Sequence, residues 1–161
     1  MSDLVADFKT AFRHHPAGIA LVTAATATGP VGLTASSVAS VALDPTSLVF
    51  SVTRATGTAG ALLGAHSLVV HFLGAQHEEL AHQFATSGGP RFTPDQPWER
   101  LPTGEPFLPD ARAAMRAVPT HVVPVGSSSL VVAEVVEVRL GPPSPALVWF
   151  DLGYHAIGGD S

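Results

Sequence analysis

The stretch that decides the fold is residues 18–37, which read GIALVTAAT, then ATGP, then VGLTASS. Both outer runs are rich in Val, Thr and small apolar residues, a composition typical of β-strands. The four residues between them end in Gly-Pro, a pair that favours a tight turn. Residues 18–26 and 31–37 therefore predict a β-hairpin near the start of the chain.

Outside this hairpin the sequence continues to favour strands over helices. Further β-type runs occupy residues 47–53, 67–72, 131–140 and 146–150. Short helices are predicted at residues 4–14, 56–64 and 76–85. Local propensity leaves residues 111–118 open between a helix and a strand. Six or seven strands with few helices and no internal repeat indicate a mainly β fold, a β-barrel with small helical additions.

The length and composition indicate how many domains the chain forms and whether it associates with itself or with a membrane. A chain of 161 residues is long enough for one domain with a sizeable core, so residues 1–161 are expected to form a single domain. Charged residues make up 13% of the chain and hydrophobic ones 46%, so part of the apolar surface is expected to be covered by a second copy in a homodimer. No apolar run is long enough to span a bilayer, and residues 1–10 are polar and acidic, unlike a signal peptide. We therefore expect a cytoplasmic protein without membrane partners.

The charge and the residue types exclude several kinds of site. A net charge of -5 offers no electrostatic footprint for nucleic acid. The absence of Cys excludes disulfides, thiolate metal ligands and a Cys nucleophile. The eight His lack the spacing that brings ligands to one face, so no metal site is predicted.

Residues 86–109 combine six prolines and three glycines with aromatic side chains. Phe92, Trp98 and Phe107 are expected to anchor this segment to the core, which makes it an ordered excursion and not a linker.

Two hydroxyl-rich segments are the first candidates for a site. They are residues 34–37, TASS, and residues 51–58, which contain Arg54. Strand and turn composition alone accounts for many such clusters. The alternative is that the two segments lie on adjacent strands, where Arg54 with Thr56 and Thr58 at the start of a helix would suit a phosphate. The GxxxxGK[ST] pattern of a P-loop is absent.

The order of these segments resembles a known family. Residues 12–45, FRHHPAGIALVT followed by GPVGLTASSVASVALDP, resemble the flavin reductase-like, FMN-binding split-barrel family, and weaker matches extend the resemblance over about residues 8–157. The resemblance implies a homodimeric split β-barrel that reduces FMN, or FAD, with NADH or NADPH. It also implies a strand at residues 111–118. Several members of this family supply reduced flavin to a partner monooxygenase.

The resemblance also implies roles for individual residues. The implied cofactor-binding set is Thr34, Ala35, Ser36, Ser37, Val52, Thr53, Arg54, Thr58, Phe84 and Phe92. Its first four members would face the isoalloxazine and the ribityl chain, the next four would hold the phosphate end, and the two Phe would flank the flavin. His155 stands where the family has an imidazole beside the nicotinamide, which makes it the candidate catalytic residue.

Two departures from the family pattern bear on activity. Ser36 replaces an Asn that is usual there, and Ser128 stands where a second His is common. Two alternatives therefore stay open. One is a flavin-binding split barrel without efficient reductase activity, acting as a carrier, sensor or accessory protein. The other is a barrel for another flat cofactor, such as haem or a deazaflavin.

Overall fold

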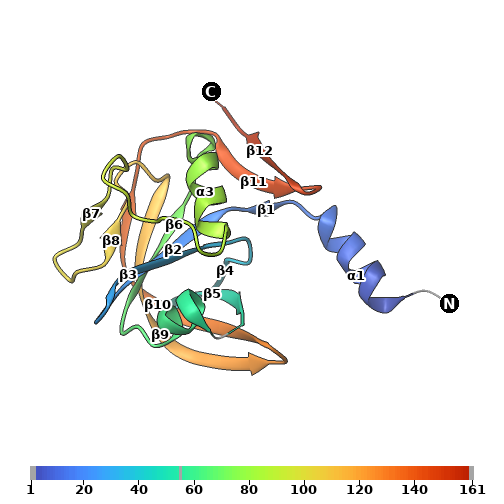
Figure 1. Cartoon of the computed structure of the whole chain (residues 1–161), viewed down its shortest axis with the longest axis horizontal. Coiled ribbons are helices and arrows are strands. Elements are labelled where there is room, and N and C mark those ends of the chain that lie inside the picture. Colours follow the sequence, from blue (N-terminus) through green and yellow to red (C-terminus); the bar gives the residue numbers. More distant parts are fainter. Residues whose placement is uncertain (1–2, 55, 160–161) are drawn as a thin grey trace.

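The computed structural model describes residues 3–54 and 56–159 and is dominated by an antiparallel seven-stranded sheet (Figure 1). The strands of this sheet are β2 (Ala20–Thr26), β3 (Gly29–Ala35), β4 (Ala39–Leu43), β5 (Thr46–Thr53), β6 (Leu68–Phe72), β9 (Ala113–Val125) and β10 (Ser128–Leu140). Their spatial order is β3-β2-β6-β9-β10-β5-β4. The expectation of a mainly β protein is confirmed.

Two smaller sheets and a few helices complete the chain. The first small sheet holds β1 (Ala17–Gly18), β11 (Ala146–Phe150) and β12 (Gly153–Ile157), and the second holds β7 (Glu99–Arg100) and β8 (Pro106–Phe107). The helices are α1 (Leu4–Arg13), α2 (Gly57–Leu63) and α3 (Glu78–Ala85), the last preceded by the 3-10 turn η1 (Ala75–His77). In the part of the chain that the structure describes, no helix is both long enough and apolar enough to cross a membrane.

The hairpin predicted from residues 18–37 is present as β2 and β3. A two-residue turn joins the strands, and Gly29, with a φ of 119°, occupies backbone space that favours glycine. The Thr26 hydroxyl donates to the Gly29 carbonyl at 2.7 Å, which closes the turn. This hairpin is therefore specified locally.

Strand β2 is buried on both faces, which explains its continuous apolar run. Ala20, Val22 and Ala24 belong to an inner core cluster, together with residues of β5, β6, β10 and α2. Ile19 and Leu21 point the other way, into an outer cluster with α3 and β11. The twofold alternation of a strand thus separates two cores on the two sides of the sheet.

Strand β3, at one edge of the large sheet, approaches β5, the strand next to the other edge. Ser37, just after β3, accepts a hydrogen bond from the backbone N–H of Ser51 on β5 at 2.9 Å, and its hydroxyl donates to the Ser51 carbonyl at 3.3 Å. Helix α2 places Leu62 in the inner core cluster, beside residues of both β3 and β5. The sheet therefore curls around the inner core.

The excursion over residues 86–109 is ordered, as its aromatic residues predict. Phe92 and Trp98 pack on Phe84 of α3, with ring centroids 4.8 Å to 5.8 Å apart. Glu105 is 1% exposed and binds Arg116 at 3.1 Å, in addition to the hydroxyl of Ser67. A closed aromatic cluster and a buried ion pair fasten the two ends of the excursion to the sheet.

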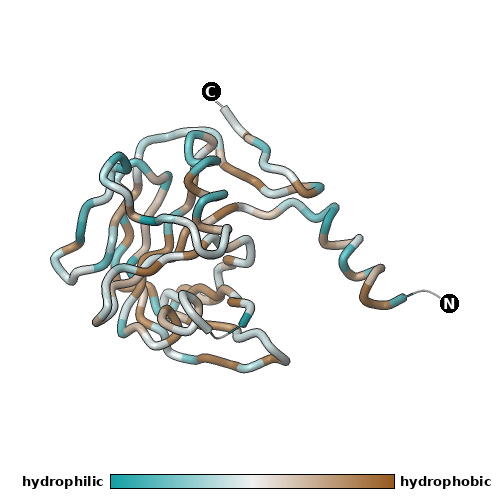
Figure 2. Tube along the Cα trace, in the orientation of Figure 1, coloured by the Kyte–Doolittle hydropathy of each residue, from teal (hydrophilic) through white to brown (hydrophobic). Residues whose placement is uncertain are grey.

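Helix α1 projects from the body of the molecule (Figure 1). Asp151 in the β11–β12 turn anchors its end, because the carboxylate accepts from Arg13 Nε at 2.6 Å and the Asp151 N–H donates to the Arg13 carbonyl at 2.8 Å. None of the described helix residues is buried, although the helix is amphipathic and apolar along one side (Figure 2).

The structure also resolves the stretch that local propensity left open. Residues 113–118 belong to β9, which pairs with β6 on one side and β10 on the other. This pairing confirms the strand that the family resemblance implies. Strand β4 was not predicted from the sequence.

Candidate functional site

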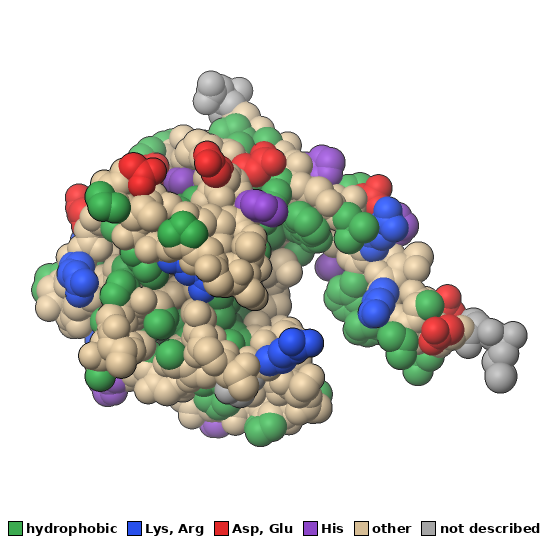
Figure 3. All heavy atoms as spheres, viewed as in Figure 1, with side chains coloured by type: hydrophobic (Ala, Val, Ile, Leu, Met, Phe, Trp, Pro, Cys, Tyr) green, Lys and Arg blue, Asp and Glu red, His purple; other side chains and the backbone are tan. Residues whose placement is uncertain are grey.

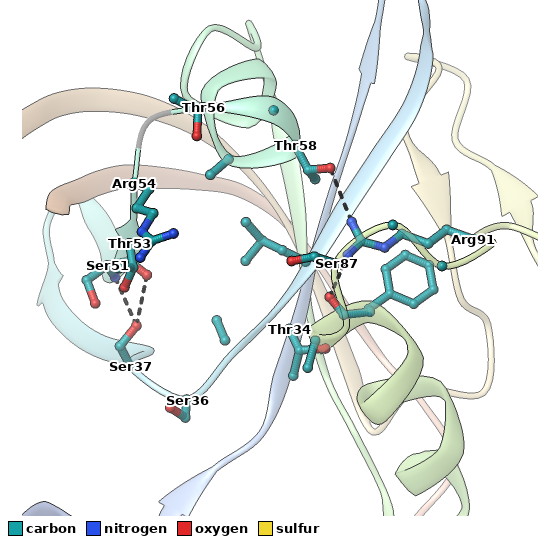
Figure 4. A pocket seen from close by; sticks show the side chains of 18 residues that line it. Thr34, Ser36, Ser37, Ser51, Thr53, Arg54, Thr56, Thr58, Ser87 and Arg91 are labelled. Atoms are coloured by element: carbon teal, nitrogen blue, oxygen red, sulfur yellow. Dashed lines mark hydrogen bonds between the residues drawn. The ribbon is translucent and has the colours of Figure 1, made fainter. Parts of the chain in front are cut away.

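A cleft of about 840 Å³ opens where the edges of the curled sheet meet α2 and the segment after α3 (Figure 4). We call it the hydroxyl cleft, because hydroxyl side chains dominate its wall. Among the described residues these are Thr34, Ser36, Ser37, Ser51, Thr53, Thr56, Thr58 and Ser87. The described residues of the two hydroxyl-rich segments therefore line the same cavity.

The charged side chains that line the hydroxyl cleft are both cations. Among the described residues Arg54 and Arg91 line it, and no Asp or Glu does. The chain as a whole carries a net charge of -5, so this wall is opposite in sign to the rest of the molecule. Acidic side chains gather instead along the edge of the molecule around α3 (Figure 3). A hydroxyl wall with two guanidinium groups suits a ligand that carries an anionic group and several polar atoms.

The backbone at Arg54 adopts an uncommon conformation at the point where β5 ends. Arg54 has a φ of 65°, in the left-handed region that is uncommon for residues other than glycine. Its backbone N–H donates to the Ser127 carbonyl at 3.0 Å, which ties the end of β5 to the β9–β10 turn. The side chain of Thr56, the N-cap residue of α2, makes no capping hydrogen bond. The Thr56 hydroxyl is therefore not committed to its own helix.

The bonds that the hydroxyls already make determine what they can offer a ligand. Thr34 donates its proton to the Ala81 carbonyl at 2.6 Å, so toward the cleft it can only accept. Ser37 donates to the Ser51 carbonyl and accepts from the Ser51 N–H, which leaves it one lone pair. This end of the cleft therefore favours ligand groups that carry hydrogen, such as imide N–H or ribityl O–H.

Arg91 is a charged lining residue that was not predicted from the sequence. Its guanidinium donates to the Gly32 and Phe84 carbonyls and to the Thr58 hydroxyl, and it lies 5.4 Å from the centroid of the Phe84 ring. Burial holds the pKa of this guanidinium below its ordinary value, although an Arg remains charged at any physiological pH. The only sequence signal was a cation beside the aromatic Phe92, inside a segment that was assigned to packing.

An aromatic ring forms the floor of the cleft next to Arg91. Phe84 is 1% exposed, and Phe92 packs against it edge to face at a centroid distance of 5.0 Å. Gly32 on β3 makes room for both rings, because a Cβ there would lie 2.8 Å from the Phe84 ring. The glycine thus lets an aromatic side chain lie directly against the strand.

The structure brings eight of the ten implied cofactor-binding residues to the hydroxyl cleft. The residues that line it are Thr34, Ala35, Ser36, Ser37, Thr53, Arg54, Thr58 and Phe84. Val52 is 3% exposed and points into the inner core cluster, and Phe92 supports Phe84 from behind. His155 lies on β12, exposed, with Nε2 3.1 Å from the Phe150 carbonyl.

A second groove adjoins the hydroxyl cleft. It lies between α1 and the body of the molecule, and its apolar wall includes Phe8, Phe12 and Trp149. The two cavities share Ser36, Ser37 and Ser51. Among residues 3–54 and 56–159 no group of three or more His, Asp or Glu is placed to hold a metal ion.

Comparison with known proteins tests the family resemblance that the sequence suggests. A family model described as flavin reductase like domain matches residues 12–158. An NADH:FMN oxidoreductase of Rhodococcus erythropolis is 41% identical over 133 residues, which cover 83% of this chain and 69% of that protein. The crystal structure of a flavin reductase domain protein from Arthrobacter sp. FB24 superposes with a TM-score of 0.90 at 30% identity, covering 98% of each chain. The flavin reductase component of a bacterial two-component tryptophan halogenase superposes with a TM-score of 0.87 at 25% identity, covering 98% of this chain and 99% of that one.

Proposed function

Because the chain belongs to the flavin reductase-like family, we propose that its hydroxyl cleft holds FMN for reduction by NADH or NADPH. The protein is an NAD(P)H-dependent flavin reductase. The observation that carries the assignment of the site is its wall, where the described residues supply hydroxyls and two cations but no carboxylate. When bound, the flavin accepts a hydride from the nicotinamide ring, so the protein supplies binding and alignment and needs no acid or base of its own at carbon.

The phosphate end of the flavin belongs, in this proposal, at Arg54, Thr56 and Thr58. Arg54 is exposed and makes no side-chain hydrogen bond with another described residue, which leaves its guanidinium available to a ligand. A guanidinium and two hydroxyl donors that line the same cleft match the charge and the hydrogen-bond acceptors of a phosphate monoester. The proposal favours FMN and accommodates FAD only if the second phosphate finds a donor outside these three residues.

The ring end belongs along residues 34–37. The Thr34 hydroxyl accepts only, so it suits a hydrogen on the flavin ring or on the ribityl chain. Ser36 lines both the cleft and the adjoining groove, so a ring beside it would have one face toward each cavity. A ring held at this boundary would leave one face open to a nicotinamide.

His155 is proposed to contact the nicotinamide and to hold it in position for hydride transfer. It lies on the small sheet whose Trp149 lines the adjoining groove. Its Nε2 lies 3.1 Å from the Phe150 carbonyl, and the imidazole makes no ion pair with a described carboxylate, although Asp151 in the adjoining turn is near enough for an electrostatic interaction. Contact with the nicotinamide would orient hydride transfer without involving the flavin phosphate.

A second copy of the chain is proposed to cover α1 and complete a split-barrel dimer. The described helix is 10 residues long, too short to be stable alone in water, and Leu4, Phe8 and Phe12 are 59% to 81% exposed. Burial of these side chains against a partner would remove apolar surface from water, which is favourable. Light scattering should report a dimer at micromolar concentration, and a monomer that still binds flavin would contradict this part of the proposal.

The reduced flavin is proposed to serve a partner monooxygenase. The halogenase reductase that this chain resembles is the reductase component of a two-component system. The partner would receive the flavin by diffusion, so the open hydroxyl cleft suits release as well as binding.

The experiment that tests the function is NADH and NADPH oxidation by the purified protein, with and without added FMN. We expect oxidation that depends on FMN, and anaerobic bleaching of the flavin when the nucleotide is added. A protein that binds FMN but bleaches with neither nucleotide would be a carrier or sensor and not a reductase. A protein that does not bind any flavin would contradict the assignment of the cleft.

A further inference from the structure

The guanidinium of Arg91 is held by four acceptors that come from three segments of the chain. Nη1 donates to the Gly32 carbonyl at 2.7 Å and to the Thr58 hydroxyl at 3.2 Å. Nη2 donates to the carbonyls of Phe84 and Thr86, each at 3.1 Å. These four bonds use all four hydrogens of the two terminal nitrogens.

The two terminal nitrogens of Arg91 therefore have no hydrogen to spare for a ligand in the cleft. The remaining donor, Nε–H, is buried and has no hydrogen-bond partner among the described residues. Both terminal nitrogens are committed to the protein, and three of the four acceptors are backbone carbonyls. A ligand anion could take a hydrogen bond from this guanidinium only by breaking one of these contacts. The two cations of the cleft thus differ, since Arg54 is free and Arg91 is fixed.

The contact with Thr58 determines how that hydroxyl can bind. A threonine hydroxyl has one proton and two lone pairs, and Arg91 occupies one of the lone pairs. The proton is consequently free to point away from the guanidinium, and Figure 4 shows the Thr58 side chain at the cleft wall on the same side as its partner Arg91. Thr34 is the opposite case, because its proton is spent on the Ala81 carbonyl.

We propose that Arg91 is a positioning residue that fixes the Thr58 hydroxyl as a hydrogen-bond donor to the flavin phosphate. This inference rests on the proposed function and adds to it how one phosphate contact is prepared. A hydroxyl that accepts from a cation becomes a stronger donor, because the two hydrogen bonds polarise each other. The bond from Arg91 already restricts rotation of this hydroxyl, so phosphate binding costs less rotational entropy.

The same four contacts also allow a competing explanation, in which Arg91 only supports the shape of the cleft. Gly32 lies on β3, Thr58 on α2, and Phe84 and Thr86 at the end of α3. One side chain thus joins the two walls of the hydroxyl cleft to the segment 85–89 at its rim. A purely structural role for Arg91 would support every flavin equally, whereas the proposed role concerns the phosphate alone.

The test compares the dissociation constants of FMN and riboflavin, which differ by the phosphate, in a double-mutant cycle of Arg91→Met and Thr58→Val. Thr58→Val should weaken FMN binding by about tenfold, as expected for one lost hydrogen bond to a charged group. Arg91→Met should weaken it by about threefold to tenfold, and the double variant should bind FMN no worse than Thr58→Val alone. Riboflavin binding should change by less than about twofold in all three variants.

Two further variants serve as controls. Thr58→Ser keeps the hydroxyl and should restore most of the FMN affinity. Arg112→Met removes an exposed guanidinium that also donates to a backbone carbonyl, that of Ser144, but lies outside the cleft lining, and should leave both flavins unaffected. If Arg91→Met does not fold, Arg91→Lys replaces it, because an ammonium keeps the charge but cannot span four acceptors.

Three results would overturn the inference. They are an equal loss of FMN and riboflavin in the Arg91 variants, additive losses of FMN in the double variant, or unchanged FMN binding in Thr58→Val. Failure of the proposed function has a different signature, since the parent protein would then bind FMN no more tightly than riboflavin. A parent that prefers FMN, with additive losses in the cycle, would refute the role of Arg91 and leave the function standing.

Discussion

The buried histidine of β6 makes the stability of the fold sensitive to acid. His71 is 0% exposed, with Nδ1 3.0 Å from the Leu21 carbonyl and Nε2 3.1 Å from the backbone nitrogen of Leu108. Because the Leu108 N–H can only donate, Nε2 must accept and Nδ1 must carry the proton. The ring is therefore satisfied in its neutral form, and a second proton would point at another donor.

The cost of protonating this ring follows from its pKa. Burial lowers the pKa of His71 from 6.5 to about 4, with a smaller contribution from the neighbouring His77. The unfolded chain takes up this proton near pH 6.5 and the folded chain only near pH 4, so the stabilisation is complete above pH 6.5 and is lost as the pH falls toward 4. The full loss is about 3 kcal/mol, of which about 2 kcal/mol is gone at pH 5.

The assay is urea unfolding of the parent protein and of His71→Gln between pH 7.5 and pH 5. One protein concentration is used throughout, because the unfolding of the proposed dimer would depend on concentration. The variant should be less stable at pH 7.5, since glutamine satisfies the two backbone partners less well. Between pH 7.5 and pH 5, the free energy of unfolding of the parent should fall by about 2 kcal/mol more than that of His71→Gln. Equal pH slopes in the two proteins would refute the reasoning.

Other substitutions test the site and its support. Arg54→Ala should weaken FMN binding by roughly tenfold to a hundredfold in a fluorescence titration and leave riboflavin unaffected, and equal losses would make Arg54 structural. His155→Ala should leave FMN affinity unchanged but slow the anaerobic bleaching of bound flavin by about tenfold in stopped flow, and an unchanged rate would remove His155 from the site. Gly32→Ala should lower the free energy of unfolding by about 1 to 3 kcal/mol, because the added Cβ would meet the Phe84 ring at 2.8 Å. Gly18→Ala, where nothing lies within 4 Å, is its control, and similar losses in both would contradict the packing argument.

The part of the fold that could be predicted is the part that is specified locally. The hairpin of β2 and β3 has its turn chemistry and its β-forming residues in one short stretch, and both strands formed where these signals stand. Residues 113–118 carry helix-favouring alanines but lie between β6 and β10, so pairing with two neighbours overrides their propensity. Strand β4 has only one partner, β5, and is exposed along most of its length, which left little pattern to detect.

The site was predictable to the extent that its residues adjoin in sequence. Residues 34–37 lie at and just after the end of β3, Thr53 and Arg54 lie at the end of β5, and Thr56 and Thr58 lie at the start of α2. All of them line the same cleft. Alternation along β5 separates Val52, which faces the core, from Ser51 and Thr53, which face the cleft. Arg91 could not be found in this way, because two of its partners, Gly32 and Thr58, lie 59 and 33 residues away in the chain and only folding brings them to the guanidinium.

The most direct test of the account is a crystal structure of the protein with FMN bound. We expect the phosphate within hydrogen-bond distance of Arg54 and Thr58, with the contact between Arg91 and Thr58 retained. The isoalloxazine ring should lie along residues 34–37, between the hydroxyl cleft and the adjoining groove. A flavin bound elsewhere, or one bound in the reverse direction with its phosphate at residues 34–37, would contradict the assignment of the site.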